Sequence, residues 1–125
     1  MKILLIEDEI AIREVYKELL VFENYVVDEA GDGDTGLTKA IAGDWDILLL
    51  DIMLPKRDGL EILTHLKAVP ELSHKPVVLL TNLDKESILK ACMDLGANGY
   101  LVKSNINPQD VVLEVQKYIN EPAGS

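Results

Sequence analysis

The stretch Ile47-Leu48-Leu49-Leu50-Asp51 is a run of four aliphatic residues that stops on an acid. Three other short apolar runs also stop on polar residues: ILLI (3–6) before Glu7 and Asp8, VVLL (77–80) before Thr81, and YLV (100–102) before Lys103. Such runs, with no polar alternation, indicate strands buried on both faces, as in a parallel sheet covered by helices. Open parallel sheets collect ligand groups at the carboxyl ends of their strands. We therefore expect these polar side chains to form one pocket for a divalent cation and an anionic group.

The buried runs alternate with amphipathic stretches, which is typical of βαβ units and predicts an α/β fold with five of them. A more mixed strand at 25–29 is expected near a sheet edge. The expected helices, with their inward residues, are one after Asp8 (Ile12, Val15, Leu19, Phe22), 33–42 (Leu37, Ile41), one capped by Asp58 and running to about Lys67, 85–95 (Ile88, Cys92, Leu95), and one after Asn107-Pro108 (Val111, Val115, Tyr118). Trp45 is expected to be a packing anchor and Cys92 a small core residue.

The composition is that of one soluble globular domain, with 125 residues, 48% hydrophobic and 27% charged. The net charge of −10 argues against nucleic acid or an anionic membrane as a direct partner, because both are polyanions. The single Cys92 excludes an internal disulfide, and no run approaches the roughly 18 apolar residues of a membrane span. The first apolar run is too short and its continuation too acidic for a secretory signal. We expect a cytoplasmic protein.

The acids at the strand ends favour a metal site. Two carboxylates within ~5 Å repel by roughly 3 kcal/mol at an effective dielectric near 20, a strain that a cation relieves. Hard oxygen ligands suit Mg²⁺, which uses one or two carboxylates and awaits a phosphate. Each residue also has a simpler interpretation: Glu7 and Asp8 as favourable charge at a helix start, Thr81 as a β-branched strand end, and Lys103 as a surface lysine. Their coincidence at four strand ends favours the site.

The segment 31–36 (GDGDTG) matches the GxGxxG pattern of dinucleotide-binding loops. Asp32 and Asp34 would place like charge against a pyrophosphate, and the segment follows the second strand instead of the first. Counted as a calcium loop from Asp32, its fifth and twelfth positions are glycines, which offer no side-chain ligand. A turn leading into a capped helix is the better interpretation.

Glu7-Asp8, Asp51, Thr81 and Lys103, with Met53-Leu-Pro55 and Asp58-Gly59 after the central acid, resemble the receiver domains of bacterial two-component response regulators, of the chemotaxis-regulator type. The resemblance covers about Lys2 to Asn120, so that 1–120 would be the receiver domain and 121–125 a short C-terminal tail. It implies a flavodoxin-like, doubly wound three-layer sandwich, with five parallel strands in the order 2-1-3-4-5 and five helices.

The resemblance also implies the chemistry of each residue. Asp51 would be the phosphoacceptor, with Mg²⁺, or Mn²⁺ in its place, as cofactor. The ion would be held by Asp8, Asp51 and the backbone carbonyl of Met53 directly and by Glu7 through water. Lys103 would pair with the phosphoryl group, Thr81 and Tyr100 would form the switch, and Met53 and Leu83 would tune dephosphorylation. Ser104 departs from the family, which often has a cis proline after this lysine, so that the loop either takes another path or bears the strain of a cis bond, about 3–4 kcal/mol.

The expected function is a phosphorylation-activated signalling switch rather than a turnover enzyme. Its partners would be a sensor histidine kinase or a histidine phosphotransfer protein upstream, and a protein effector or a truncated effector domain downstream, with phosphorylation-dependent homodimerisation as a further expectation. The signal would leave through the face built from the helix at 85–95, the strand at 100–102 and the last helix. Two alternatives are a constitutive interaction module with the same fold and a nucleotide- or flavin-binding carrier.

Overall fold

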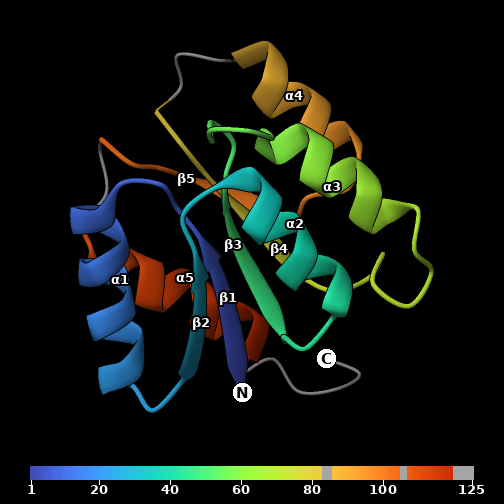
Figure 1. Ribbon diagram of the computed structural model, residues 1–125. Coiled ribbons are helices and arrows are strands. Elements are labelled where there is room, and N and C mark those ends of the chain that lie inside the picture. Colours follow the sequence, from blue (N-terminus) through green and yellow to red (C-terminus); the bar gives the residue numbers. More distant parts are fainter. Residues whose placement is uncertain (83–85, 105–106, 120–125) are drawn as a thin grey trace.

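Five parallel strands form the centre of the computed structural model, which describes residues 1–82, 86–104 and 107–119 (Figure 1). The strands are β1 (Lys2–Ile6), β2 (Val26–Ala30), β3 (Ile47–Asp51), β4 (Val77–Thr81) and β5 (Gly99–Val102). Their order in the sheet is β2-β1-β3-β4-β5, and every neighbouring pair is parallel. The predicted flavodoxin-like topology is confirmed, and the mixed second strand lies at an edge as expected.

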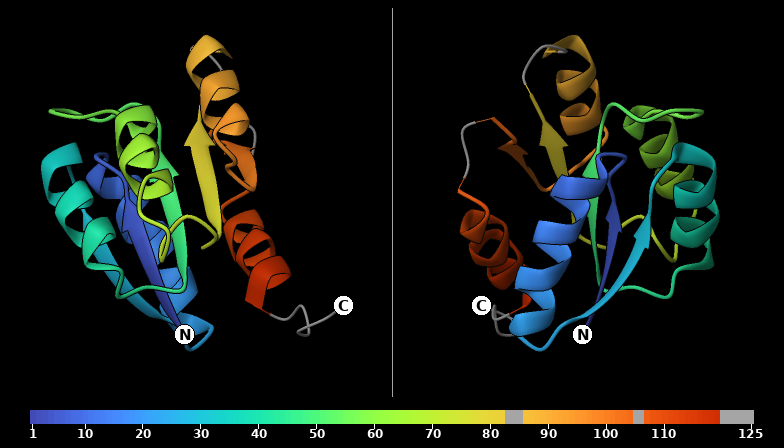
Figure 2. Two further views of the ribbon diagram at one scale, coloured as in Figure 1. Left: turned by 90° about the vertical axis from the view of Figure 1, so that its right-hand side faces the viewer. Right: turned by 60° about the vertical axis from the view of Figure 1, so that its left-hand side comes forward.

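The helices cover both faces of the sheet (Figure 2). They are α1 (Ile10–Phe22), α2 (Gly33–Ala42), α3 (Gly59–Lys67), α4 (Glu86–Asp94) and α5 (Gln109–Ile119). Residues of α2, α3 and α4 pack on one face, and residues of α1 and α5 pack on the other. No described helix has the length and apolar character needed to cross a membrane.

Strand β3 shows why its sequence has no polar alternation. Leu48 and Leu50 belong to the hydrophobic cluster under α2–α4, whereas Ile47 and Leu49 belong to the cluster under α1 and α5. Successive side chains of a strand point to opposite faces, and both faces are covered here. All five residues of β3 are buried, so that Asp51 is carried on a rigid strand end.

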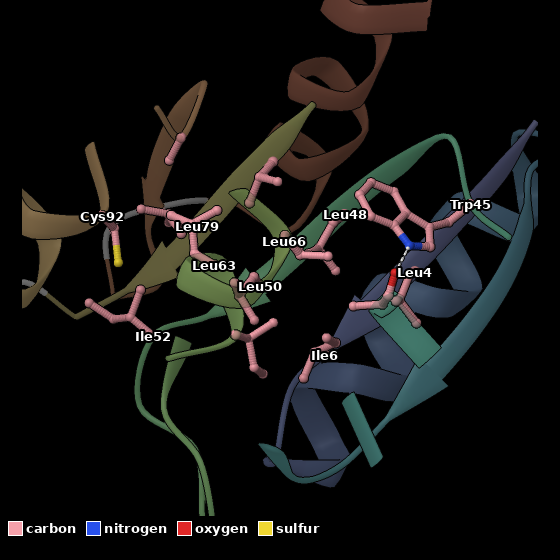
Figure 3. Packing of buried hydrophobic residues seen from close by; sticks show 14 of the residues in the cluster. Leu4, Ile6, Trp45, Leu48, Leu50, Ile52, Leu63, Leu66, Leu79 and Cys92 are labelled. Atoms are coloured by element: carbon pink, nitrogen blue, oxygen red, sulfur yellow. Dashed lines mark hydrogen bonds between the residues drawn. The ribbon is translucent and has the colours of Figure 1, made fainter. Parts of the chain in front are cut away.

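Local signals place the helix ends where the sequence predicts them. The carboxylates of Asp32 and Asp58 accept hydrogen bonds from the backbone N–H groups of Thr35 and Glu61, at 2.8 and 2.9 Å, and cap α2 and α3. The GDGDTG segment is therefore a turn with a capped helix. Trp45 is 3% exposed and donates its indole N–H to the Ala40 carbonyl at 2.9 Å, and Cys92 is fully buried in the same cluster (Figure 3).

The predicted inward faces of three helices are partly wrong. On α1 the buried residues are Tyr16 and Leu20, whereas Val15 and Phe22 are 42% and 82% exposed. The sequence of this helix, IAIREVYKELLVF, has apolar residues on both sides of Tyr16 and Leu20, so spacing alone does not fix which of them face the sheet. Ile41 is 40% exposed, because Ala40 takes the inward position on α2. Leu95 is 37% exposed and lies just past the end of α4, whose buried residues are Leu89 and Cys92.

Candidate functional site

The parallel register brings the four strand ends to one edge of the sheet. Ile6 is paired with Leu50, Asp51 with Leu80, and Thr81 with Val102. Backbone hydrogen bonds extend this alignment past the strands, from the Lys103 N–H to the Thr81 carbonyl at 2.7 Å and from the Ile52 N–H to the Leu80 carbonyl at 3.2 Å. Glu7, Asp51, Thr81 and Lys103 thus end on the same edge, as predicted.

Three carboxylates lie together there. Glu7, Asp8 and Asp51 each offer an oxygen atom, and these atoms lie within 4.8 Å of one another. Glu7 is fully buried, Asp51 is 3% exposed, and Asp8 is partly exposed. Buried charges of one sign at this distance are costly unless a cation is shared among them.

Lys103 supplies positive charge to this cluster. Its side chain is 5% exposed, and its Nζ lies 2.9 Å from Glu7 Oε1 and 2.9 Å from Asp51 Oδ2. A third contact, 3.2 Å to Glu9 Oε1, involves an acid that the sequence analysis did not single out. The peptide bonds of the described residues are all trans, so the Lys103–Ser104 bond is trans and Lys103 still reaches the acids.

The electrostatics of the cluster follow from burial and from these contacts. Burial, together with the charge of Asp51, raises the pKa of Glu7 to about 7, although Lys103 acts in the opposite direction. Burial also raises the pKa of Asp51, against the Met53 N–H and Lys103. For Lys103, burial alone would lower the pKa, but the hydrogen bonds to Glu7 and Asp51 outweigh it and the net change is upward.

The remaining predicted residues lie at different distances from the cluster. Thr81 is 1% exposed at the end of β4. Tyr100 is 46% exposed and pairs with Leu79, two register pairs before the Thr81–Val102 pair. Met53 is 42% exposed, and its backbone N–H donates to Asp51 Oδ1 at 3.0 Å. Leu83 lies outside the described residues.

Two further residues hold the ends of the acidic strands, and the sequence analysis missed the first of them. Arg13, on α1, donates to the carbonyl of Glu7 at 2.8 Å and to Glu29 at 3.0 Å, which ties the end of β1 to β2. Gly59 packs so closely behind Asp51 that a Cβ would lie 2.7 Å from the Ile52 Cα and 2.9 Å from the Asp51 carbonyl oxygen. This contact is the physical reason for glycine in the Asp58-Gly59 pair.

The donor set fits a hard divalent cation. The Oε2 atom of Glu7 is buried and has no hydrogen-bond partner among the described residues, which is costly for a carboxylate oxygen. The cluster offers carboxylate oxygens and no nitrogen or sulfur ligand, the combination that suits Mg²⁺. A doubly wound sheet of order 2-1-3-4-5 with this acidic edge defines an α/β sandwich whose carboxylate cluster could hold a divalent metal ion.

Comparison with known proteins gives the family. Residues 3–116 match the model of the response regulator receiver domain, and the chain belongs to this family. It is 35% identical over 115 residues to the transcriptional regulatory protein ResD of Bacillus subtilis (strain 168), which covers 92% of this chain and 46% of ResD. The chain spans about half the length of the curated relatives it matches.

Two solved structures show the same fold. The chemotaxis response regulator CheY4 of Vibrio cholerae has a TM-score of 0.84 at 27% identity, over 94% of this chain and 97% of that one. The receiver domain of the sensor histidine kinase PA1611 from Pseudomonas aeruginosa PAO1 has a TM-score of 0.84 at 26% identity, over 96% and 98%. That structure has a magnesium ion coordinated in its active site cleft. Receiver domains of response regulators are phosphorylation-based signalling switches of two-component systems and not conventional enzymes.

Proposed function

We propose that this chain is switched by phosphorylation of Asp51 in a Mg²⁺-dependent reaction. The observation that carries the proposal is a buried Asp51 carboxylate that lies beside two other acids and is held by an ammonium group at 2.9 Å. Asp8, Asp51 and the Met53 carbonyl would bind the ion directly, and Glu7 would bind it through water. When bound, the ion neutralises charge on the carboxylates and on the phosphoryl oxygens.

The two oxygens of Asp51 have different surroundings, which suggests how the transfer proceeds. Oδ1 accepts from the Met53 N–H at 3.0 Å, and Oδ2 accepts from Lys103 at 2.9 Å. One carboxylate oxygen attacks the phosphorus of a phosphohistidine, forming an O–P bond while the P–N bond breaks, and the leaving imidazole nitrogen keeps the electron pair and takes up a proton. Before transfer Lys103 contacts the Asp51 carboxylate, and after transfer it pairs with the phosphoryl group on Asp51.

The upstream donor would be a sensor histidine kinase or a histidine phosphotransfer protein. Downstream, the similarity to transcriptional regulators of about twice the length supports an effector domain or an effector protein controlled by this domain. Thr81 would move toward the phosphoryl group, and Tyr100 would respond on the face formed by α4, β5 and α5, where a phosphorylation-dependent homodimer would also form. The assignment of 1–120 to the receiver domain remains a prediction, and the tail at 121–125 lies outside the described residues.

Intact mass after incubation with acetyl phosphate tests the proposal. The wild type should gain one phosphoryl group with Mg²⁺ and almost none with a chelator, and Asp51→Asn should gain none because the amide is a poor nucleophile. Asp44→Asn is the matched control, since Asp44 is an exposed acid paired with Lys2 at 2.7 Å, at the opposite end of β3. An Asp51→Asn protein phosphorylated at the wild-type rate would refute the assignment. A wild type that gains no phosphoryl group would favour the constitutive module.

A further inference from the structure

The loop that follows Asp51 is held against the start of α2 by contacts that the proposed phosphorylation chemistry does not use. The Gly33 N–H donates to the Pro55 carbonyl at 2.9 Å. A Cβ on Gly33 would lie 2.6 Å from the Arg57 N and 2.5 Å from the Arg57 Cβ, and closer still to the Arg57 carbonyl oxygen. Only glycine permits this approach of two backbone segments.

Charged side chains join the same two segments. Arg57 Nε lies 2.8 Å from Asp34 Oδ1, and Lys56 Nζ lies 3.8 Å from Asp32 Oδ2. In the same loop, Lys56 has a φ of +73°, a left-handed backbone conformation that is unfavourable for residues other than glycine. Such a conformation persists where the surroundings determine the path of the chain.

The far end of the loop is fixed as well. The Gly59 N–H donates to the Ile52 carbonyl at 3.0 Å, and Asp58 caps α3. The loop from Ile52 to Asp58 is thus held at one end by Gly59 behind Asp51 and near its middle by Gly33 on α2. Met53 and Leu54 lie between these two points, and the Met53 carbonyl is the proposed backbone ligand.

We propose that Gly33 and Asp34 are positioning residues that set the β3–α3 loop, and with it the Met53 carbonyl, for Mg²⁺ binding. This inference rests on the proposed function of the acidic site. It gives the GDGDTG segment a role other than phosphate binding. Gly33 lets the loop backbone approach α2, and Asp34 forms an ion pair with Arg57. Residues that orient metal ligands from outside the coordination shell typically change metal affinity by about 10- to 100-fold.

The test compares glycines at the two ends of α2. Gly33→Ala should weaken Mg²⁺ binding, measured by isothermal titration calorimetry, by about tenfold or more. It should also shift the Met53 and Leu54 amide signals of the metal-free protein. Gly43→Ala is the control, because Gly43 has a φ of +75° at the C-cap and its replacement costs stability far from the loop. It should lower the unfolding midpoint and leave the Mg²⁺ Kd unchanged.

Asp34→Asn keeps the test decisive if Gly33→Ala does not fold. Because the Asp34–Arg57 pair is exposed, we expect a weakening of about two- to threefold. Asp44→Asn removes an equal charge elsewhere and should have no such effect. Arg57 also pairs with Glu61 at 3.2 Å, so the charge swap is tested in a Glu61→Gln background. In that background the double variant Asp34→Arg, Arg57→Asp should bind Mg²⁺ more tightly than Arg57→Asp alone.

The outcomes separate this inference from the proposed function. If the wild type binds Mg²⁺ and takes up phosphoryl while Gly33→Ala and Asp34→Asn have the wild-type Kd, the positioning role is refuted and the phosphorylation site stands. If the wild type does neither, both fail. A weaker Kd in Gly33→Ala, with most of the phosphorylation rate regained at saturating Mg²⁺, supports positioning of the metal ligand.

Discussion

Replacing Glu7 with glutamine should stabilise the metal-free protein at neutral and higher pH. The pKa of Glu7 rises from an ordinary 4.5 to about 7 in the folded protein, chiefly through burial. Between these two values the folded state binds more protons than the unfolded state, so the free energy of unfolding falls as the pH rises. Each pH unit in this window contributes about 1.4 kcal/mol, which gives a loss of about 3 kcal/mol by pH 7. Glutamine carries no charge and should avoid that loss.

The size of the gain should depend on pH in a defined way. Below about pH 4.5 Glu7 is protonated in both states, and wild type and variant should unfold at the same urea concentration. Above pH 7 the variant should be more stable by up to about 3 kcal/mol. The hydrogen bond from Lys103 to the side-chain oxygen can persist in glutamine, so the change isolates the charge of Glu7.

Urea unfolding from pH 4 to 8.5 in the presence of a chelator measures this difference. The fluorescence of Trp45 is a suitable signal, since it is the one tryptophan of the chain and is 3% exposed. Glu71→Gln, at an exposed position, is the matched control and should show no pH-dependent gain. A Glu7→Gln protein that is less stable than wild type at pH 8 would mean that the attraction of Lys103 outweighs burial, and the reasoning would be refuted.

Three other substitutions test the metal site and the loop. Asp8→Ala should remove most of the thermal stabilisation that Mg²⁺ gives to the wild type, because an ion bound only to the native state stabilises it by RT ln(1 + [L]/Kd); equal shifts would place the ion elsewhere. Lys56→Gly should raise the free energy of unfolding in urea by up to about 1 kcal/mol. Glycine removes the strain of the left-handed backbone at this position, although it increases the conformational entropy of the unfolded chain. A lower free energy of unfolding than that of the wild type would contradict this prediction. Met53→Asn should speed the loss of phosphoryl, followed by mass, because an amide can orient water where Met53 is apolar and 42% exposed; an unchanged or longer lifetime would argue against water access there.

The parts of the fold that could be predicted are those with an uninterrupted local signal. β3 and β4 begin where their apolar runs begin and end one residue past them, on Asp51 and Thr81. Asp58 and Gly59 mark the start of α3. The carboxyl ends of parallel strands lie at one edge of the sheet, which is why the sequence alone groups Glu7, Asp51, Thr81 and Lys103. The inward face of α1 could not be predicted, because apolar residues lie on both sides of Tyr16 and Leu20.

Contacts between segments distant in the chain also escaped prediction. The pairing of Glu9 with Lys103 depends on the path of the backbone after β1, and the approach of Gly33 to Arg57 depends on how α2 and the β3–α3 loop meet. Neither pair has a periodicity or a spacing that marks it. The GDGDTG segment shows the difference most clearly: its local residues predict a turn and a capped helix, which the structure has, but they do not predict its contacts with Pro55 and Arg57.

Successive side chains of β3 belong alternately to two hydrophobic clusters, so the sheet separates two cores that are packed independently. Leu49 and Leu50 are neighbours in the chain, yet each packs among the side chains of a different set of helices. Substitutions that share no packing partners have nearly additive effects on stability. A lineage can therefore remodel α1 and α5 without repacking α2, α3 and α4, and the reverse.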